Sequence, residues 1–230
     1  MPKLRQKVWI TRAEPGASAT AERVQALGYQ AVVAPLLTLQ PLTGVRVDLS
    51  GVAALAFTSA NGVRAFADIC GERSLRVFAV GVATAQAARK AGFRAVLSAD
   101  GDVGALVNGI ASRRKELIGT VLHPGALEVA GDLVGGLEAQ GVPARTLALY
   151  ESVPATVDDP QALVASDAVL LHSPKAATVL AGVLRANPAP GLRALGLSRA
   201  VLKPLGRLPL AERAYPPFPL EAGLLNLLHR

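Results

Sequence analysis

The feature that most constrains the fold of this chain is an internal repeat. LAFTSANGVRAF, residues 55–66, returns as VLLHSPKAATVL, residues 169–180, so Ser173 stands 114 residues after Ser59 in a chain of 230 residues. A glycine follows each serine at nearly the same interval, Gly81 after 22 residues and Gly196 after 23. The chain therefore contains two copies of one structural unit, and we expect the two resulting domains to meet at a ligand-binding cleft.

Short apolar segments alternate with amphipathic stretches throughout both copies. KVWIT, ALAFTS and RVFAVG in the first half correspond in character to TVLHP, DAVLLHS and RALGLS in the second. One predicted helix has its apolar residues at helical spacing, and they are Ala176, Val179, Leu180, Val183 and Leu184. This alternation predicts the α/β class, with two similar parallel-sheet domains covered by helices on both faces.

Composition and motifs argue against several classes of protein. No apolar run approaches the ~20 residues of a membrane span, and the basic start MPKLRQK leads directly into VWI without a signal-peptide pattern. We therefore expect a soluble, cytoplasmic protein. Cys70, the single cysteine, cannot form an internal disulfide. Nucleotide fingerprints, phosphate loops and metal motifs are missing, which predicts no cofactor and no metal, with His123 and His172 as packed or turn-lining residues.

The net charge of +7 has two interpretations. The 24 lysines and arginines are scattered and aromatic residues are few, which argues against a nucleic-acid partner. A polyanionic small molecule would suit this charge. A generic basic surface that keeps the protein in solution would suit it equally.

Small polar residues occupy six segments in which a predicted strand gives way to a helix. In a parallel sheet such segments lie at the carboxyl edge of the strands, where helix N-termini offer free N–H groups to anions. The serines would serve as plain N-caps if each segment stood alone, whereas six such segments in a duplicated cleft favour an anion-binding site. The segments are Thr11–Arg12, Thr58–Asn61, Gly81–Thr84, His123–Gly125, Ser173–Lys175 and Gly196–Arg199.

Taken in order, these segments resemble the uroporphyrinogen-III synthase family over nearly the whole chain. The resemblance rests on WITRAEPGASATAERVQALGYQAVVAPLLTLQP, FTSANGVRAF, AVGVATAQAARKAGF, LYESVP and LLHSPKAATVL. It implies two α/β domains joined by a two-stranded β connector, the second domain being inserted into the first. On this sequence it places one domain at residues 1–34 and 157–230, the other at 42–145, and the connecting strands at 35–41 and 146–156.

The resemblance also implies an activity. Members of the family are cofactor-independent lyases of haem biosynthesis that cyclise hydroxymethylbilane, a linear tetrapyrrole with eight carboxylates. Water is lost from the terminal hydroxymethyl group, and ring D is inverted through a spiro intermediate. A polyanionic substrate would give the charge of +7 a purpose. We expect the protein to work as a monomer.

The same resemblance assigns candidate site residues. Tyr150 in LALYESVP matches the tyrosine that is suspected of assisting departure of the hydroxyl group, although a phenol that merely packs would explain its position equally well. HPG at His123 and SRA at Ser198 depart from the usual family pattern. The predicted substrate contacts are Arg12, Thr58, Ser59, Asn61, Gly81, Thr84, Gly125, Ser173, Pro174, Lys175, Ser198 and Arg199.

Two other functions fit parts of this pattern. A non-catalytic two-domain sensor of an anionic metabolite would share the duplication, the cleft and the basic charge, but it would not require Tyr150. A nucleotide-using enzyme of doubly wound fold is disfavoured, because the glycine fingerprint is missing and no acidic residue ends the second predicted strand.

Overall fold

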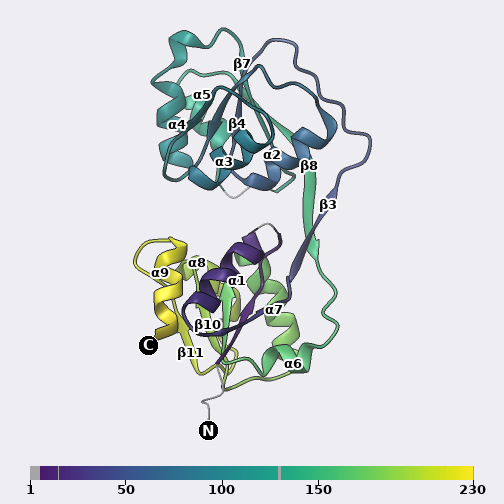
Figure 1. The fold of residues 1–230 in the computed structure, drawn as a ribbon, viewed down its shortest axis with the longest axis vertical. Helices are drawn as coiled ribbons and strands as arrows, with labels where there is room; N and C mark the ends of the chain where they lie inside the picture. Colours follow the sequence, from purple (N-terminus) through teal and green to yellow (C-terminus); the bar gives the residue numbers. More distant parts are fainter. Residues whose placement is uncertain (1–5, 15, 129–130, 230) are drawn as a thin grey trace. The chain divides into compact units, whose positions relative to one another are not determined.

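The computed structural model describes residues 6–14, 16–128 and 131–229, so both ends of the predicted first domain, residues 1–5 and 230, lie outside it. The chain forms two units (Figure 1). Unit 1 combines the chain up to Thr38 with the chain from Val153 onward, and unit 2 runs from Leu39 to Ser152. The boundaries 34/35, 41/42, 145/146 and 156/157 remain predictions.

Unit 1 contains a five-stranded sheet whose neighbouring strands all run parallel, in the order β11-β10-β9-β1-β2. The strands are β1 Lys7–Ile10, β2 Gln30–Val33, β9 Ala168–Leu171, β10 Arg193–Gly196 and β11 Glu212–Ala214. The helices are α1 Gly16–Ala26, α6 Pro160–Val164, α7 Pro174–Ala186, α8 Arg199–Leu202 and α9 Glu221–Asn226, with short 3-10 turns η2 Lys203–Leu205 and η3 Leu227–His229.

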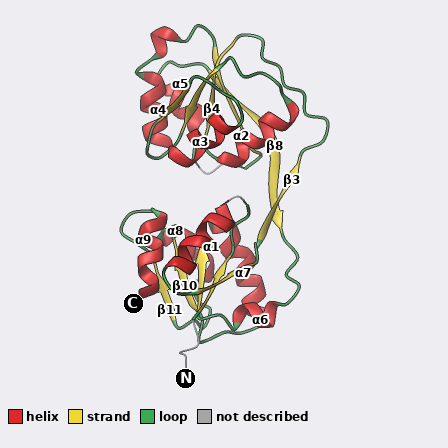
Figure 2. Cartoon of the chain, in the orientation of Figure 1, coloured by secondary structure: helices red, strands yellow, loops and turns green. Residues whose placement is uncertain are grey.

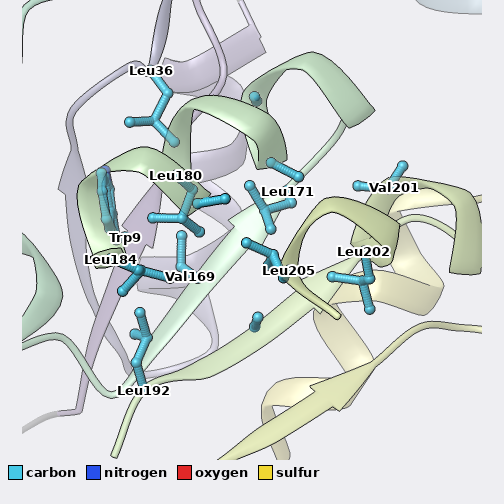
Figure 3. Packing of buried hydrophobic residues seen from close by; sticks show 14 of the residues in the cluster. Trp9, Leu36, Val169, Leu171, Leu180, Leu184, Leu192, Val201, Leu202 and Leu205 are labelled. Carbon is cyan, nitrogen blue, oxygen red and sulfur yellow. The ribbon is translucent and has the colours of Figure 1, made fainter. Parts of the chain in front are cut away.

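Helices cover both faces of this sheet. On one face, Trp9 and Val169 pack against Leu180 of α7 and against residues of α8 and η2 (Figure 3). On the other face, Ile10 packs with α1 and α9. The predicted helical stripe is confirmed, since its residues are buried in α7 or packed against this core.

Unit 2 contains a six-stranded sheet in the order β3-β8-β7-β4-β5-β6. Its strands are β3 Leu37–Pro41, β4 Val52–Phe57, β5 Arg76–Ala79, β6 Val96–Ser98, β7 Thr120–Ala126 and β8 Ala144–Pro154. Its helices are α2 Ala60–Ile69, α3 Val82–Lys90, α4 Val103–Ala111 and α5 Leu133–Ala139, with the 3-10 turn η1 Arg114–Glu116. Helices α2 and α3 cover one face and α4 and α5 the other (Figure 2).

The edge strand β3 is antiparallel to β8. Leu42 donates its N–H to the carbonyl of Leu149, and Ala155 donates to the carbonyl of Leu36, so the paired positions move in opposite directions along the chain. The other pairs of this sheet, from β8 to β6, are parallel. Two parallel sheets and a two-stranded connection therefore confirm the predicted fold class.

The two sheets are assembled crosswise from the two sequence repeats. In unit 1 the strands β2 and β1 are followed by β9, β10 and β11, and in unit 2 the strands β8 and β7 are followed by β4, β5 and β6. Each unit thus joins the opening strands of one repeat to the closing strands of the other. This exchange explains why unit 1 is discontinuous in sequence.

The structure refines the correspondence between the repeats. Gly81 is the N-cap residue of α3, whereas Gly196 is the last residue of β10. Ser198 is the N-cap residue of α8 and is therefore the positional counterpart of Gly81. Gly81 and Gly196 therefore have different structural roles, although each follows its serine at nearly the same interval in the sequence.

The predicted turn at His123–Gly125 is wrong. All three residues are buried within β7, so Gly125 is a strand residue and not a turn residue open to substrate. The N–H of Val121 donates to the carbonyl of Pro143, on the side of β7 that faces β8. Backbone N–H groups alternate in direction along a strand, so the nitrogen of Pro124 faces β4. Since the pairing with β4 ends at Leu122, a proline at 124 costs no ladder hydrogen bond, and the strand continues along β8.

Helix α2 approaches β7 closely at Gly62. A Cβ atom at this position would lie 2.7 Å from the carbonyl oxygen of Pro124, a backbone atom that cannot swing away. We expect Gly62→Ala to lower the free energy of unfolding by about 1–2 kcal/mol, because it pushes α2 off the sheet. Gly109→Ala, in an open part of α4, should instead raise it by about 0.5–1 kcal/mol. Urea unfolding of both variants would test this contrast.

Candidate functional site at the carboxyl edges of the sheets

Two adjacent residues that follow the carboxyl end of β4 bind side chains from β7 and β8. The Oγ1 atom of Thr58 lies 3.1 Å from Nε2 of His123 on β7. The Oγ atom of Ser59 lies 3.2 Å from the hydroxyl oxygen of Tyr150 on β8. The predicted residues Thr58, Ser59 and Tyr150 therefore come together at one edge of the unit 2 sheet, and His123 joins them from inside it.

Ser59 is held in place by the helix that follows it. Its extended backbone and its side chain form the N-cap of α2, with Oγ accepting the N–H of Gly62 at 3.1 Å. In unit 1, Ser173 and Ser198 cap α7 and α8 in the same way. The N-cap interpretation of these serines is confirmed, and their contact with substrate remains a prediction.

Tyr150 is a buried phenol that reaches a groove. Its residue is 7% exposed and packs with Leu55, Phe57 and Leu149. Burial raises the pKa of Tyr150 because it disfavours the phenolate, and the hydrogen bond between Tyr150 and Ser59 opposes part of that effect. The hydroxyl is thus protonated at neutral pH and able to give a proton to a leaving group.

The groove beside Tyr150 has a volume of about 460 Å³ and lies within unit 2. Its walls mix apolar and polar side chains, and Asn61 accepts a hydrogen bond of 2.8 Å from Arg64 there. The lining contains one cation and one carboxylate, and its residues are Leu39, Pro41, Leu42, Gly44, Val45, Asn61, Arg64, Ala65, Asp68, Ile69, Leu149 and Tyr150.

Buried His123 beneath this edge is neutral. Its residue is 1% exposed, and burial lowers the pKa of the imidazole. Its Nδ1 atom has no hydrogen-bond partner among the described residues. The prediction of a packed histidine is confirmed, although it packs within a strand.

In unit 1, Arg12 belongs to a cluster centred on Glu221 of α9. Its Nη1 atom lies 3.3 Å from Oε1 of Glu221, and Thr20 and Arg23 bind the same carboxylate. Nε2 of His172 lies 3.6 Å from Oε1. Burial alone would raise the pKa of Glu221, but these hydrogen bonds and charges outweigh it and lower the pKa to about 2. Arg12 is therefore already paired with a carboxylate.

Sequence reasoning missed Glu221, Thr20 and Arg23. Glu221 is 209 residues from Arg12, and no local motif marks either partner. Only the fold, which places α9 beside α1, brings them together. Gly16 adds to this arrangement, since a Cβ atom there would lie 2.4 Å from the Arg12 guanidinium.

Comparisons with known proteins identify the family. The family model described as Uroporphyrinogen-III synthase HemD matches residues 18–226. The chain belongs to the uroporphyrinogen-III synthase family. It is accordingly a lyase of porphyrin biosynthesis that converts hydroxymethylbilane to the type III product. A search of curated proteins finds no match.

Solved uroporphyrinogen-III synthases share the fold at low sequence identity. The enzyme from Helicobacter pylori 26695 is 16% identical over 98% of both chains, with a TM-score of 0.64. A mutant of the enzyme from Thermus thermophilus is 16% identical over 97% of this chain and 96% of that one, with a TM-score of 0.52. Residue roles in the present synthase must come from its own geometry.

A second groove of this synthase is basic. It has a volume of about 740 Å³ and lies in unit 1 beside α8, η2 and β11. Arg199, Lys203 and Arg213 contribute three cations, and its described lining contains no carboxylate. Arg213 is fixed by hydrogen bonds to the carbonyls of Leu205 and Leu208. Only Arg199 of this group was predicted from the sequence.

The other predicted contacts occupy the expected strand ends, with differences in exposure. Ser173, Pro174 and Lys175 begin α7, and Gly81 begins α3. Thr84, by contrast, is buried in the first turn of α3.

Among the described residues no group of three or more metal-ligating side chains exists, and no helix there has the length and apolarity to span a membrane.

Proposed function

We propose that Tyr150 protonates the leaving hydroxyl of hydroxymethylbilane while the carboxyl edges of both sheets hold the substrate carboxylates. The observation that carries this proposal is the hydrogen bond between Tyr150 and Ser59 beside the unit 2 groove. A protonated phenol lines this groove, whose walls are partly apolar, so one pyrrole ring can bind near the donor.

The chemistry needs one proton and returns one. The phenol proton leaves with the hydroxyl group as water when the C–O bond breaks, and the nitrogen lone pair of the pyrrole stabilises the resulting azafulvenium cation. After attack at ring D, fragmentation and reclosure, the pyrrole loses a proton as it regains aromaticity, and that proton restores the phenol. The protein supplies geometry, because it selects attack at the substituted carbon over direct closure.

Binding of the carboxylates is proposed for both units. In unit 2 the contacts are Thr58, Ser59, Asn61 and Gly81, and in unit 1 they are Arg12, Ser173, Pro174, Lys175, Ser198 and Arg199. The three cations of the basic groove extend the unit 1 contacts and suit a substrate with many carboxylates.

We expect Lys203→Glu to raise KM by about threefold to tenfold with kcat nearly unchanged, because it places a like charge beside bound carboxylates. Added salt should reduce this difference. Lys115→Glu, the same charge change at another exposed position, is the matched control. Equal KM values for the two variants at low salt would remove the basic groove from the binding site.

The deciding experiment supplies freshly made hydroxymethylbilane to the purified protein and separates the product isomers after oxidation to porphyrins. We expect the type III isomer in excess, whereas unassisted closure gives type I. Binding without any change in the isomer ratio would contradict the function and favour the sensor alternative.

We also propose that the protein acts in the cytoplasm as a monomer, without a nucleic-acid partner. The free thiol of Cys70 suits a reducing compartment. The scattered cations suit a small anionic ligand better than a polynucleotide. Light scattering with and without substrate would test the oligomeric state.

A further inference from the structure

We propose that Ser59 is a positioning residue that donates its hydroxyl proton to Tyr150 and so directs the phenol proton toward the substrate. This inference rests on the proposed role of Tyr150 as proton donor. It adds a second function to a residue that already caps a helix.

Hydrogen-bond accounting supports this direction of donation. The Ser59 hydroxyl accepts the N–H of Gly62 and lies 3.2 Å from the hydroxyl of Tyr150. A serine hydroxyl has one proton to give, and the cap bond does not use it. If Tyr150 donated to Ser59, its proton would be occupied. If Ser59 donates, the proton of Tyr150 is free for the leaving group.

Burial disfavours a negative charge on Tyr150, and two features near Ser59 oppose that effect as the proton departs. Ser59 begins the ten-residue helix α2, so the positive end of the helix dipole lies behind its hydroxyl. Tyr150 is buried, and a hydrogen bond to a developing phenolate is stronger in such an environment than in water.

The position of Ser59 is fixed by packing. Gly62 lies against the Pro124 carbonyl, which sets the first turn of α2 on β7, the strand next to the β8 strand that carries Tyr150. The cap bond to Gly62 restricts the serine side chain further. Because packing and the cap bond already fix the Ser59 hydroxyl, it loses little conformational entropy when the phenolate develops.

Ser173 shows that this arrangement is not a general property of the caps. It has nearly the same backbone angles as Ser59, −146° and 151° against −154° and 153°, and caps α7 through Ala176. The serine–tyrosine pair is thus an addition to the cap in unit 2.

The test measures the phenol itself as well as turnover. Ultraviolet titration of each protein against its Tyr150→Phe derivative isolates the ionisation of Tyr150. We expect Ser59→Ala to raise the Tyr150 pKa further and to lower kcat about tenfold. Ser59→Thr, which keeps the hydroxyl and the cap, should restore both.

Asp102→Ala is the matched control, because Asp102 caps α4 of the same unit through Ala105 and does not contact Tyr150. It should lower the melting temperature about as much as Ser59→Ala while leaving the Tyr150 pKa and kcat at wild-type values. Should Ser59→Ala fail to fold, Ser59→Asp keeps a cap acceptor but has no proton to donate at neutral pH. The same rise in the Tyr150 pKa is then expected.

Two results would overturn this inference, and they are distinguishable. If Ser59→Ala leaves the Tyr150 pKa and kcat unchanged while Tyr150→Phe still slows turnover, Ser59 is only a cap and Tyr150 keeps its role. If Tyr150→Phe turns over like wild type, the donor role is wrong and the inference about Ser59 falls with it.

Discussion

Tyr150→Phe is expected to lower kcat about a hundredfold, the contribution typical of a positioned proton donor. The substitution removes one oxygen atom and retains the ring that packs with Phe57 and Leu149. KM should change little, because the carboxylates bind elsewhere. The wild-type rate should also fall in alkaline solution as the phenol ionises, and the variant should lack that decline. Steady-state rates over a range of pH would measure both effects.

Tyr29→Phe is the control for this experiment. Its hydroxyl donates to the carbonyl of Leu228 at 2.8 Å, so its loss should cost about 1 kcal/mol of stability without affecting turnover. If Tyr150→Phe keeps wild-type kcat and its alkaline decline, Tyr150 is a packed phenol, the alternative that its sequence context left open.

The elements that sequence reasoning predicted well depend on local physical rules. Apolar runs such as VAALAF, now β4, were recognisable because a strand in a parallel sheet is buried on both faces. Ser59 and Ser173 were recognisable as N-caps because the residue preceding a helix needs a side-chain acceptor. The bounds of β11 could not be predicted, since ERA is only three residues long and lies in a proline-rich segment that suits both strand and turn.

The site was only partly predictable, because its chemistry depends on contacts between distant segments. Tyr150 and Ser59 were each selected, yet the hydrogen bond between them joins the N-cap residue of α2 to a residue of β8 that is 91 positions away. The segment His123–Gly125 was predicted to be a turn between a strand and a helix, whereas it lies inside β7. A proline is tolerated in β7 because the pairing with β4 ends at Leu122, before Pro124. The point at which that pairing ends cannot be read from the sequence.

Glu221→Gln is expected to lower the free energy of unfolding by about 2 kcal/mol at neutral pH. The wild-type carboxyl has its pKa lowered from 4.5 to about 2 by Arg12, Arg23 and its hydrogen-bond donors, and its side chain is 21% exposed. Each pKa unit corresponds to about 1.4 kcal/mol, and partial exposure to solvent reduces the total. The neutral amide keeps the shape of the side chain but leaves the two guanidinium groups without their shared charge.

The stabilisation by Glu221 is expected to depend on pH in a definite direction. A carboxyl group whose pKa is lowered on folding stabilises the protein fully above its unfolded pKa, and that stabilisation is lost as the pH falls through the folded value. The gap between wild type and Glu221→Gln should therefore be constant above about pH 5 and close between pH 4.5 and about 2. Urea unfolding across this range would measure it. Glu212→Gln, which breaks the more exposed ion pair with Arg193, should cost less than about 1 kcal/mol. A gap that persists unchanged down to pH 2 would show that Glu221 acts through shape and not through charge.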